Sequence, residues 1–320
     1  MKRMLHRVCA AIFSVYFLII PVFAADELIP VGEIIGLELS DGTVTVAAYD
    51  DAVTAARDAG VQIGDRLLSI DNRRVTCSAD VRRALQASDG TVDLLLHRNG
   101  ADIRLQLQPA VSPDGPRLGV FLRQGITGIG TITFFDPDTG TFGTLGHGVN
   151  DSCGALLPMK QGRAYEAEVV SIQRGKAGTP GLLKGALDGS RQTGILTRNT
   201  RQGVFGTAPG RWTGKPIPVC PAEEVRSGDA VIRCAATGTA QEYSVEILKI
   251  YPKSRTDGRN LLLRVTDPDL LRATGGIVQG MSGSPIIQDG KLVGAVTHVL
   301  VNDPTRGYGI FIENMLDAAA

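Results

Sequence analysis

The residue with the clearest chemical potential is a serine in a glycine-rich segment. Residues 280–285 read GMSGSP, so Ser282 has a glycine two positions before it and another directly after it. A tight turn of this composition can expose the Ser282 hydroxyl while the amides of Gly280 and Ser282 point at one place. Such a pair of amides stabilises negative charge on a carbonyl oxygen. These residues predict nucleophilic catalysis by Ser282, with Gly280 and Ser282 as the oxyanion hole.

A serine nucleophile needs a base, and the chain has four histidines. His6 lies in an N-terminal apolar segment, and His97 lies beside a predicted hairpin turn. His147 lies in the segment GTLGHG at the end of an apolar run, where small neighbours leave room for a substrate and for rotation of the imidazole. His298 ends a strand that follows the serine segment, and we expect it to line a pocket or to pack. His147 is therefore the predicted general base.

The acid that would orient His147 is left open by the residues alone. Six aspartates between the histidine and the serine are candidates: Asp151, Asp188, Asp229, Asp257, Asp267 and Asp269. Asp267 also has a purely structural explanation, because it precedes Pro268 and could cap a short helix predicted over residues 268–273.

The elements that must position these residues are mostly strands. The chain contains 39 glycines and only 5% aromatic residues, and short alternating apolar runs separated by turn signals follow a Pro-rich linker at residues 109–116. Apart from residues 268–273 and 313–319, helical periodicity is nearly absent from this part. The pattern predicts a β-sandwich or β-barrel domain over residues 111–320.

Residues 26–110 form a second predicted unit. The segment AGVQIGDRLLSID at residues 59–71 resembles the most recognisable stretch of PDZ domains. A helix is predicted over residues 79–87, and Asn99-Gly100 predicts a hairpin between two strands. The resemblance implies that Ile35, Gly36 and Leu37 form the loop that holds a peptide carboxylate, and that the next strand pairs with the ligand. The alternative is a PDZ-shaped domain that only packs against its neighbour.

Residues 1–25 have the layout of an export segment. Lys2, Arg3 and Arg7 precede an apolar run at residues 8–20, and Ala24 offers a small residue for cleavage. This pattern is typical of a secretory signal peptide, although the run is also long enough for an uncleaved membrane anchor. Either interpretation predicts that the protein works outside the cytoplasm.

Charge and cysteine usage exclude several functions. The formal net charge is zero and no basic stripe is present, which argues against a nucleic-acid partner. The cysteines are scattered without a CxxC motif or a histidine at ligand spacing, so we expect no metal and no cofactor. Cys220 and Cys234 could form a disulfide in an oxidising compartment, or they could be buried thiols.

Longer segments carry a family resemblance. The serine segment resembles the Gly-x-Ser-Gly-Gly-Pro loop of chymotrypsin-fold peptidases, in which the position of Ser284 is a structural glycine, so Ser284 is the weaker nucleophile. Residues 265–268, 274–285, 294–299 and 302–309 resemble the stage IV sporulation protein B (SpoIVB) peptidases. These resemblances imply a mainly β protein in which a chymotrypsin-like double β-barrel follows the PDZ domain.

The SpoIVB resemblance also implies the active residues and the biology. His147 matches the family's catalytic histidine, Ser282 its nucleophile and Asp267 its third catalytic residue. The implied activity is cleavage of a membrane-associated regulatory protein, and of the chain itself, in the space between the mother cell and the forespore during sporulation. The expected partners are this protein substrate, a membrane-embedded regulator of a protease, and a peptide C-terminus or extended segment in the PDZ groove.

The sequence leaves two other functions open and supports one hypothesis about substrate specificity. The chain could be a non-catalytic PDZ adaptor on a peptidase-like body, or a hydrolase that uses Cys153 with His147. Residues 275–279, which precede the serine loop, read GGIVQ and contain no acid to pair with a basic side chain. We therefore expect a primary specificity pocket that favours apolar or small residues.

Overall fold

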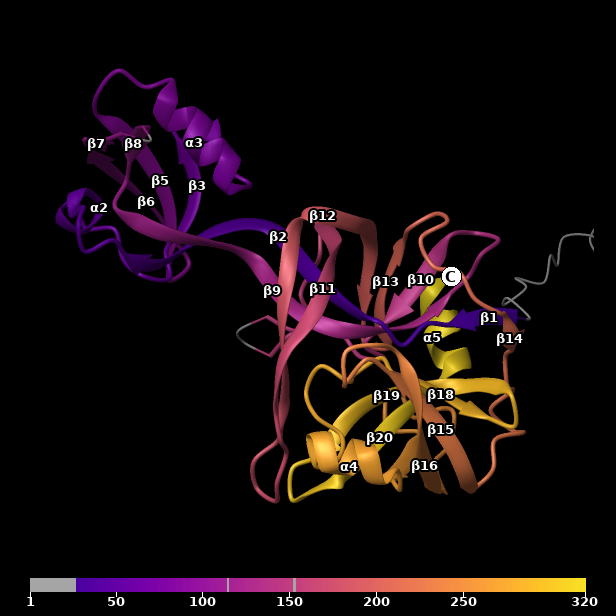
Figure 1. Cartoon of the computed structure of the whole chain (residues 1–320). Coiled ribbons are helices and arrows are strands. Elements are labelled where there is room, and N and C mark those ends of the chain that lie inside the picture. The colour runs from indigo at the N-terminus through magenta and orange to yellow at the C-terminus, as the bar shows by residue number, and fades with distance from the viewer. Residues whose placement is uncertain (1–26, 114, 152–153) are drawn as a thin grey trace, which may run out of the picture.

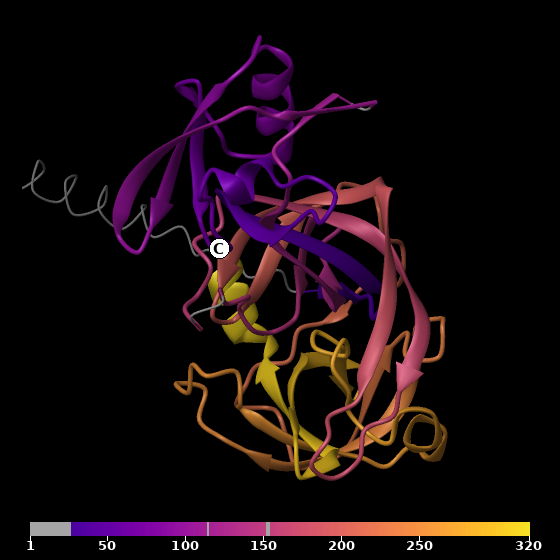
Figure 2. The same cartoon turned by 90° about the vertical axis from the view of Figure 1, so that its left-hand side faces the viewer.

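The computed structural model describes residues 27–113, 115–151 and 154–320. They form a small α+β domain and two β-barrels, which Figure 1 shows from one side and Figure 2 after a quarter turn. This architecture confirms the predicted fold class. The predicted export segment at residues 1–25 lies outside the described residues. Within the described ranges, no helix has the length and apolar character needed to cross a membrane.

Six strands close the first barrel. Its ring is formed by pairing of neighbours in the order β9-β10-β13-β12-β11-β2, and β2 pairs with β9 to close it. Two short strands, β1 and β14, extend the sheet beyond β9. The bounds are β1 (Glu27–Pro30), β2 (Ile34–Tyr49), β9 (Val120–Phe135), β10 (Thr141–Thr144), β11 (Gln161–Gln173), β12 (Leu182–Thr200), β13 (Gly203–Thr207) and β14 (Ile217–Pro218).

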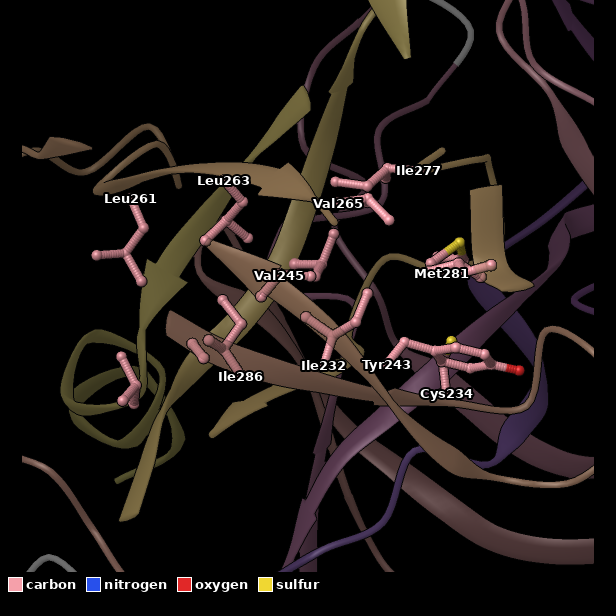
Figure 3. Packing of buried hydrophobic residues seen from close by; sticks show 14 of the residues in the cluster. Ile232, Cys234, Tyr243, Val245, Leu261, Leu263, Val265, Ile277, Met281 and Ile286 are labelled. Atoms are coloured by element: carbon pink, nitrogen blue, oxygen red, sulfur yellow. The ribbon is translucent and has the colours of Figure 1, made fainter. Parts of the chain in front are cut away.

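The second barrel is also closed, in the order β15-β16-β17-β20-β19-β18. Its core is a dense cluster of aliphatic side chains from alternating strand positions, such as Ile232, Val245 and Leu263 (Figure 3). Burial of this apolar surface is the main force that holds the barrel closed. The bounds are β15 (Gly228–Cys234), β16 (Gln241–Ile250), β17 (Leu261–Val265), α4 (Pro268–Thr274), β18 (Pro285–Gln288), β19 (Lys291–Leu300), β20 (Asp303–Phe311) and α5 (Ile312–Ala319).

The α+β domain has its own core, in which Val81 and Leu85 of one helix pack on strand residues such as Leu94. The predicted hairpin is present, and both Asn99 and Gly100 have positive φ angles of 52° and 84°. Positive φ at both central residues is what this type of tight turn requires. The bounds are α2 (Ala55–Asp58), β3 (Arg66–Ile70), β4 (Arg73–Arg74), α3 (Ser78–Gln86), β5 (Val92–Arg98), β6 (Ala101–Leu107), β7 (Ala110–Ser112) and β8 (Gly115–Arg117).

Two long strands connect the small domain to the first barrel. β2 and β9 pair from Ile34↔Thr131 at one end to Tyr49↔Val120 at the other, and both run out of the barrel into the α+β domain (Figures 1 and 2). The small domain is therefore inserted between two neighbouring barrel strands. The unit predicted at residues 26–110 thus begins inside the first barrel, because alternation of apolar residues does not say which sheet a strand joins.

The cysteines that the structure describes are free. Cys220 and Cys234 are both buried and form no disulfide, which leaves the buried-thiol interpretation. Burial raises the pKa of the Cys234 thiol to about 11, so this thiol is unreactive at neutral pH. Cys153 lies outside the described residues.

Candidate active site

His147 and Ser282 line the same groove. The groove has a volume of about 460 Å³ and lies where the two barrels meet, with walls from β2 and β9 on one side and from the serine loop and β19 on the other. The structure therefore brings together the predicted nucleophile and the predicted base, which come from different barrels. A cleft between two barrels is a suitable place for a bound peptide.

The serine loop has the backbone that its glycines predict. Gly280 and Gly283 both have φ angles of 98°, a conformation that residues with a Cβ rarely adopt. A Cβ on Gly283 would also lie 2.0 Å from the carbonyl oxygen of Thr131. Between the two glycines, the side chain of Met281 is fully buried in the core of the second barrel (Figure 3). The buried Met281 side chain therefore holds the loop against the core of the second barrel.

Strand β9 of the first barrel holds the serine loop from the other side. The Thr131 amide donates to the Ser282 carbonyl at 3.0 Å, and the Thr131 hydroxyl donates to the Gly280 carbonyl at 2.9 Å. The Thr133 hydroxyl donates to the Gly283 carbonyl at 2.7 Å, and both threonines are fully buried. Buried hydrogen bonds of this kind fix the loop in one conformation. Sequence reasoning missed these threonines, because threonine in a strand is unremarkable.

The two serines of the loop have different surroundings. The Ser282 hydroxyl faces the groove and donates to the Thr297 carbonyl at 2.8 Å. The Ser284 hydroxyl is fully buried and donates to the Met281 carbonyl, so it has a structural role. Among the described residues, the amides of Gly280 and Ser282 donate to no other group, and they remain available for an oxyanion.

His147 follows β10 after a strained turn in which Leu145 and Gly146 have φ angles of 69° and 67°. A Cβ on Gly146 would lie 2.8 Å from the Thr297 side chain, so the turn requires a glycine there. Nδ1 of His147 donates to the Gly148 carbonyl at 2.9 Å, which leaves Nε2 as the basic nitrogen. Burial lowers the pKa of His147, and the hydrogen bond to Gly148 opposes this in part. The imidazole is therefore neutral and able to accept a proton at neutral pH.

Asp267 does not line the groove with these two residues. Its carboxylate accepts hydrogen bonds from the amides of Asp269 and Leu270 at 3.0 and 2.9 Å, and a longer one from Ser244 at 3.3 Å. It is the N-cap of α4, which was its predicted structural role. The catalytic role, which rests on resemblance alone, stays a prediction.

A second histidine lies next to the base. The ring centroids of His147 and His298 are 5.4 Å apart, and His298 also lines the groove. From its sequence position His298 was expected only to line a pocket or to pack, and its place beside His147 was not predicted. The available signal was the strand return: β18 leads away from the serine loop and β19 pairs antiparallel with β18, so the C-terminal end of β19 lies near that loop.

The chain matches the models of two known families. The family model described as SpoIVB peptidase S55 matches residues 115–316, and a PDZ domain model matches residues 51–98. The chain belongs to the SpoIVB peptidase S55 family. It is therefore a serine endopeptidase that carries a PDZ domain, as the sequence predicted.

The curated relatives are similar to this chain over only part of their own length. A protein of Rhizobium meliloti (strain 1021) described as "Putative zinc metalloprotease R01501" is 33% identical over 122 residues, 38% of this chain and 31% of that protein. A protein of Agrobacterium fabrum with a similar description is 36% identical over 90 residues, 28% of this chain and 23% of that protein. The chain thus spans less than a third of either relative. Within the residues that the structure describes, no group of three or more His, Cys, Asp or Glu could hold a metal ion.

Two solved proteases are similar at low sequence identity. The active form of the Rv3671c protease of M. tuberculosis is 16% identical, with 60% of this chain and 72% of that chain covered and a TM-score of 0.37. The serine endoprotease of Yersinia pestis is 13% identical, with 59% of this chain and 55% of that chain covered and a TM-score of 0.34.

One sequence-based prediction about peptide binding by the PDZ domain of this S55 peptidase is wrong. Ile35, Gly36 and Leu37 were expected to form a carboxylate-binding loop, but they lie in β2, paired with β11 on one side and β9 on the other. Ile35 and Leu37 are buried in the first barrel, so no edge is left for a ligand. A groove of about 340 Å³ lies instead between α3 and residues 118–122.

Proposed function

We propose that this S55 peptidase uses Ser282 as its nucleophile and His147 as its general base. The observation that carries this proposal is their shared position in one groove, with Ser282 on a glycine loop and Nε2 of His147 free to accept a proton. No hydrogen bond joins the two side chains in the described structure, since the Ser282 hydroxyl contacts Thr297. Catalytic hydrogen bonds are often formed only with substrate bound.

In the proposed reaction, the Ser282 hydroxyl turns from Thr297 to His147, whose Nε2 takes its proton as the oxygen attacks the scissile carbonyl. The amides of Gly280 and Ser282 donate to the oxyanion of the tetrahedral intermediate. The imidazolium then protonates the leaving amine, and a water activated by the same nitrogen releases the acyl group. Removal of one oxyanion donor typically costs about 10²–10³-fold in rate.

We infer that the primary specificity pocket is apolar. The groove beside Ser282 is lined mainly by aliphatic side chains, including Leu37, Ile129, Ile277 and Val278. The described residues that line it include no aspartate or glutamate, so a lysine or arginine side chain would find no ionic partner. An apolar or small side chain at the cleaved position would be favoured, since its burial releases water from both surfaces.

We propose that the enzyme is exported and acts outside the cytoplasm on a membrane-associated regulatory protein, and on itself, during sporulation. The basic and apolar pattern of residues 1–25 supports export, and membership of the S55 family supports the sporulation role. We propose that its peptide partner binds in the groove between α3 and residues 118–122. There β9 pairs with β2 along one edge, and its other edge is paired with no described strand. A strand edge beside a helix suits an extended peptide.

A fluorophosphonate probe tests the nucleophile directly, because it labels an activated serine. We expect the full chain to be labelled at Ser282, and we expect Ser282→Ala and His147→Ala to abolish labelling. Ser284→Ala is the matched control, because this serine lies two positions away and is buried. Cys153→Ala should leave labelling unchanged. Absence of labelling in the folded wild-type protein would contradict the proposal and favour the adaptor interpretation.

A further inference from the structure

The side chain of His298 carries an unexplained polar atom. Its Nδ1 is fully buried and has no hydrogen-bond partner among the described residues. A buried nitrogen without a partner is costly, and such atoms in native structures are commonly explained by a functional state in which the partner is present. The neighbouring ring is that of His147, with a centroid distance of 5.4 Å and an interplanar angle of 39°.

The backbone around His298 is firmly held. The hydroxyl of the preceding residue, Thr297, donates to the carbonyl of Gly258 at 2.6 Å, and its own carbonyl accepts the Ser282 hydroxyl. His298 itself pairs with Tyr308 of β20. The backbone that carries the His298 ring is therefore fixed relative to both the nucleophile and the base, as a positioning residue requires.

The ionisable groups that face His298 keep it neutral. Burial is the main cause that lowers the pKa of His298 to about 4, and the neighbouring His147 and Arg259 lower it further. Asp257 opposes this, but it forms an ion pair with Arg255 at 2.7 Å. At neutral pH the His298 ring is an uncharged imidazole with one nitrogen that accepts a hydrogen bond.

We propose that His298 is the positioning residue for the catalytic base: its buried Nδ1 accepts a hydrogen bond from Nδ1–H of His147 when that ring turns from Gly148 toward Ser282. This inference rests on the proposed roles of Ser282 and His147. The Ser282 proton goes to Nε2 of His147 and from there to the leaving amine. The Nδ1 proton stays on His147 throughout, so His298 orients the base and stabilises its imidazolium form without changing protonation state.

The position of the acids supports this assignment. Asp267 accepts hydrogen bonds from two backbone amides of α4 and from the Ser244 amide of β16, and Asp257 is engaged by Arg255. No described carboxylate lines the groove with His147. The group in contact with the base is thus an imidazole. A neutral acceptor stabilises an imidazolium less than a carboxylate does, so we expect a modest dependence of rate on this contact.

The rate of labelling of the full chain by a fluorophosphonate tests the inference without knowledge of the natural substrate. We compare the wild type with His298→Phe, which keeps a ring but removes the acceptor, and with His298→Asn, whose amide oxygen can stand near the position of Nδ1. We expect His298→Phe to lower the maximal labelling rate by about 10–100-fold with little change in probe affinity. His298→Asn should recover most of the rate.

The pH dependence of labelling supplies the readout that a merely structural role would not change. A hydrogen bond from the imidazolium raises the pKa of His147, so its loss in His298→Phe should move the acid limb of the profile to lower pH.

Several results would contradict the inference. If the wild type is labelled and His298→Phe keeps both the wild-type rate and the wild-type acid limb, the role of His298 is wrong and the proposed function stands. Equal losses in both variants with an unmoved acid limb would also overturn the inference. If His298→Phe does not fold, the acid limb of His298→Asn decides. Absence of labelling in the wild type would instead contradict the proposed function.

Discussion

Replacement of Asp267 by asparagine separates the two roles that this residue can have. As the N-cap of α4, Asp267 accepts two amide hydrogen bonds with one carboxylate oxygen, at 3.0 Å from Asp269 and 2.9 Å from Leu270. An asparagine oxygen can accept both of these, and asparagine caps helices about as well as aspartate. The contact that asparagine would lose is the longer one of 3.3 Å from the Ser244 amide.

The contacts of Asp267 therefore predict a small effect on folding and on activity. Asp267→Asn should unfold at nearly the wild-type temperature and label with fluorophosphonate within about threefold of the wild-type rate, because neither the cap nor the groove changes. Asp267→Ala removes the cap and should cost about 1 kcal/mol of stability, which is a shift of a few degrees in Tm. A third catalytic residue would behave differently, since loss of its charge costs about 10²–10⁴-fold in rate.

The assay combines thermal unfolding with labelling rates on the same samples. Asp269→Asn is the matched control, because Asp269 is the next acid of the same helix and pairs only with the exposed Arg272. A folded Asp267→Asn protein that labels at least 100-fold more slowly than Asp269→Asn would refute this reasoning. It would establish the catalytic role that the family resemblance implies, and it would require the helix cap to open during catalysis.

Four further predictions concern the candidate site. The acid limb of the labelling profile should have its midpoint below pH 6.5, because burial lowers the pKa of His147 below its ordinary value of 6.5; a midpoint above 6.5 would contradict this. As the pH is lowered, the unfolded chain binds protons at His147 and His298 at a higher pH than the folded chain does. Tm should therefore fall as the pH drops from 6.5 toward about 4. Gly283→Ala should abolish labelling, since its Cβ would meet Thr131, whereas Gly90→Ala, with open space around it, should be silent. Profiling with a peptide library should return cleavage after apolar or small residues, and strict cleavage after lysine or arginine would exclude the apolar pocket.

Local rules predicted the local structure well. The strand at residues 92–98 and the Asn99-Gly100 turn are present, because alternation and the turn's need for positive φ are both encoded in neighbouring residues. The helix predicted over residues 79–87 is α3 (Ser78–Gln86), and its N-cap is Cys77, because the Asp80 carboxylate accepts from the Cys77 amide. A side chain three positions later thus decided where the helix begins.

Pairing over long distances could not be predicted from the sequence. Ile35, Gly36 and Leu37 have the alternation of any half-buried strand, and only the structure shows that they pair with β9 and β11 in a barrel. His298 was underestimated for the same reason. Its importance depends on the contact with His147, which comes from the other barrel, whereas the strand return in the sequence indicates only that His298 lies near the serine loop.

The same long-range pairing explains why the active site needs both barrels. The second barrel supplies Ser282 on a glycine loop, and Thr131 and Thr133 of β9 in the first barrel donate hydrogen bonds to the loop's carbonyls at Gly280, Ser282 and Gly283. The first barrel also supplies His147, whose turn is packed against Thr297 of the second barrel. Each barrel therefore completes the hydrogen bonding or packing of the residue that we propose as catalytic in the other. Because β9 continues into the PDZ domain, the strand that fixes the serine loop is also one wall of the proposed peptide groove between α3 and residues 118–122.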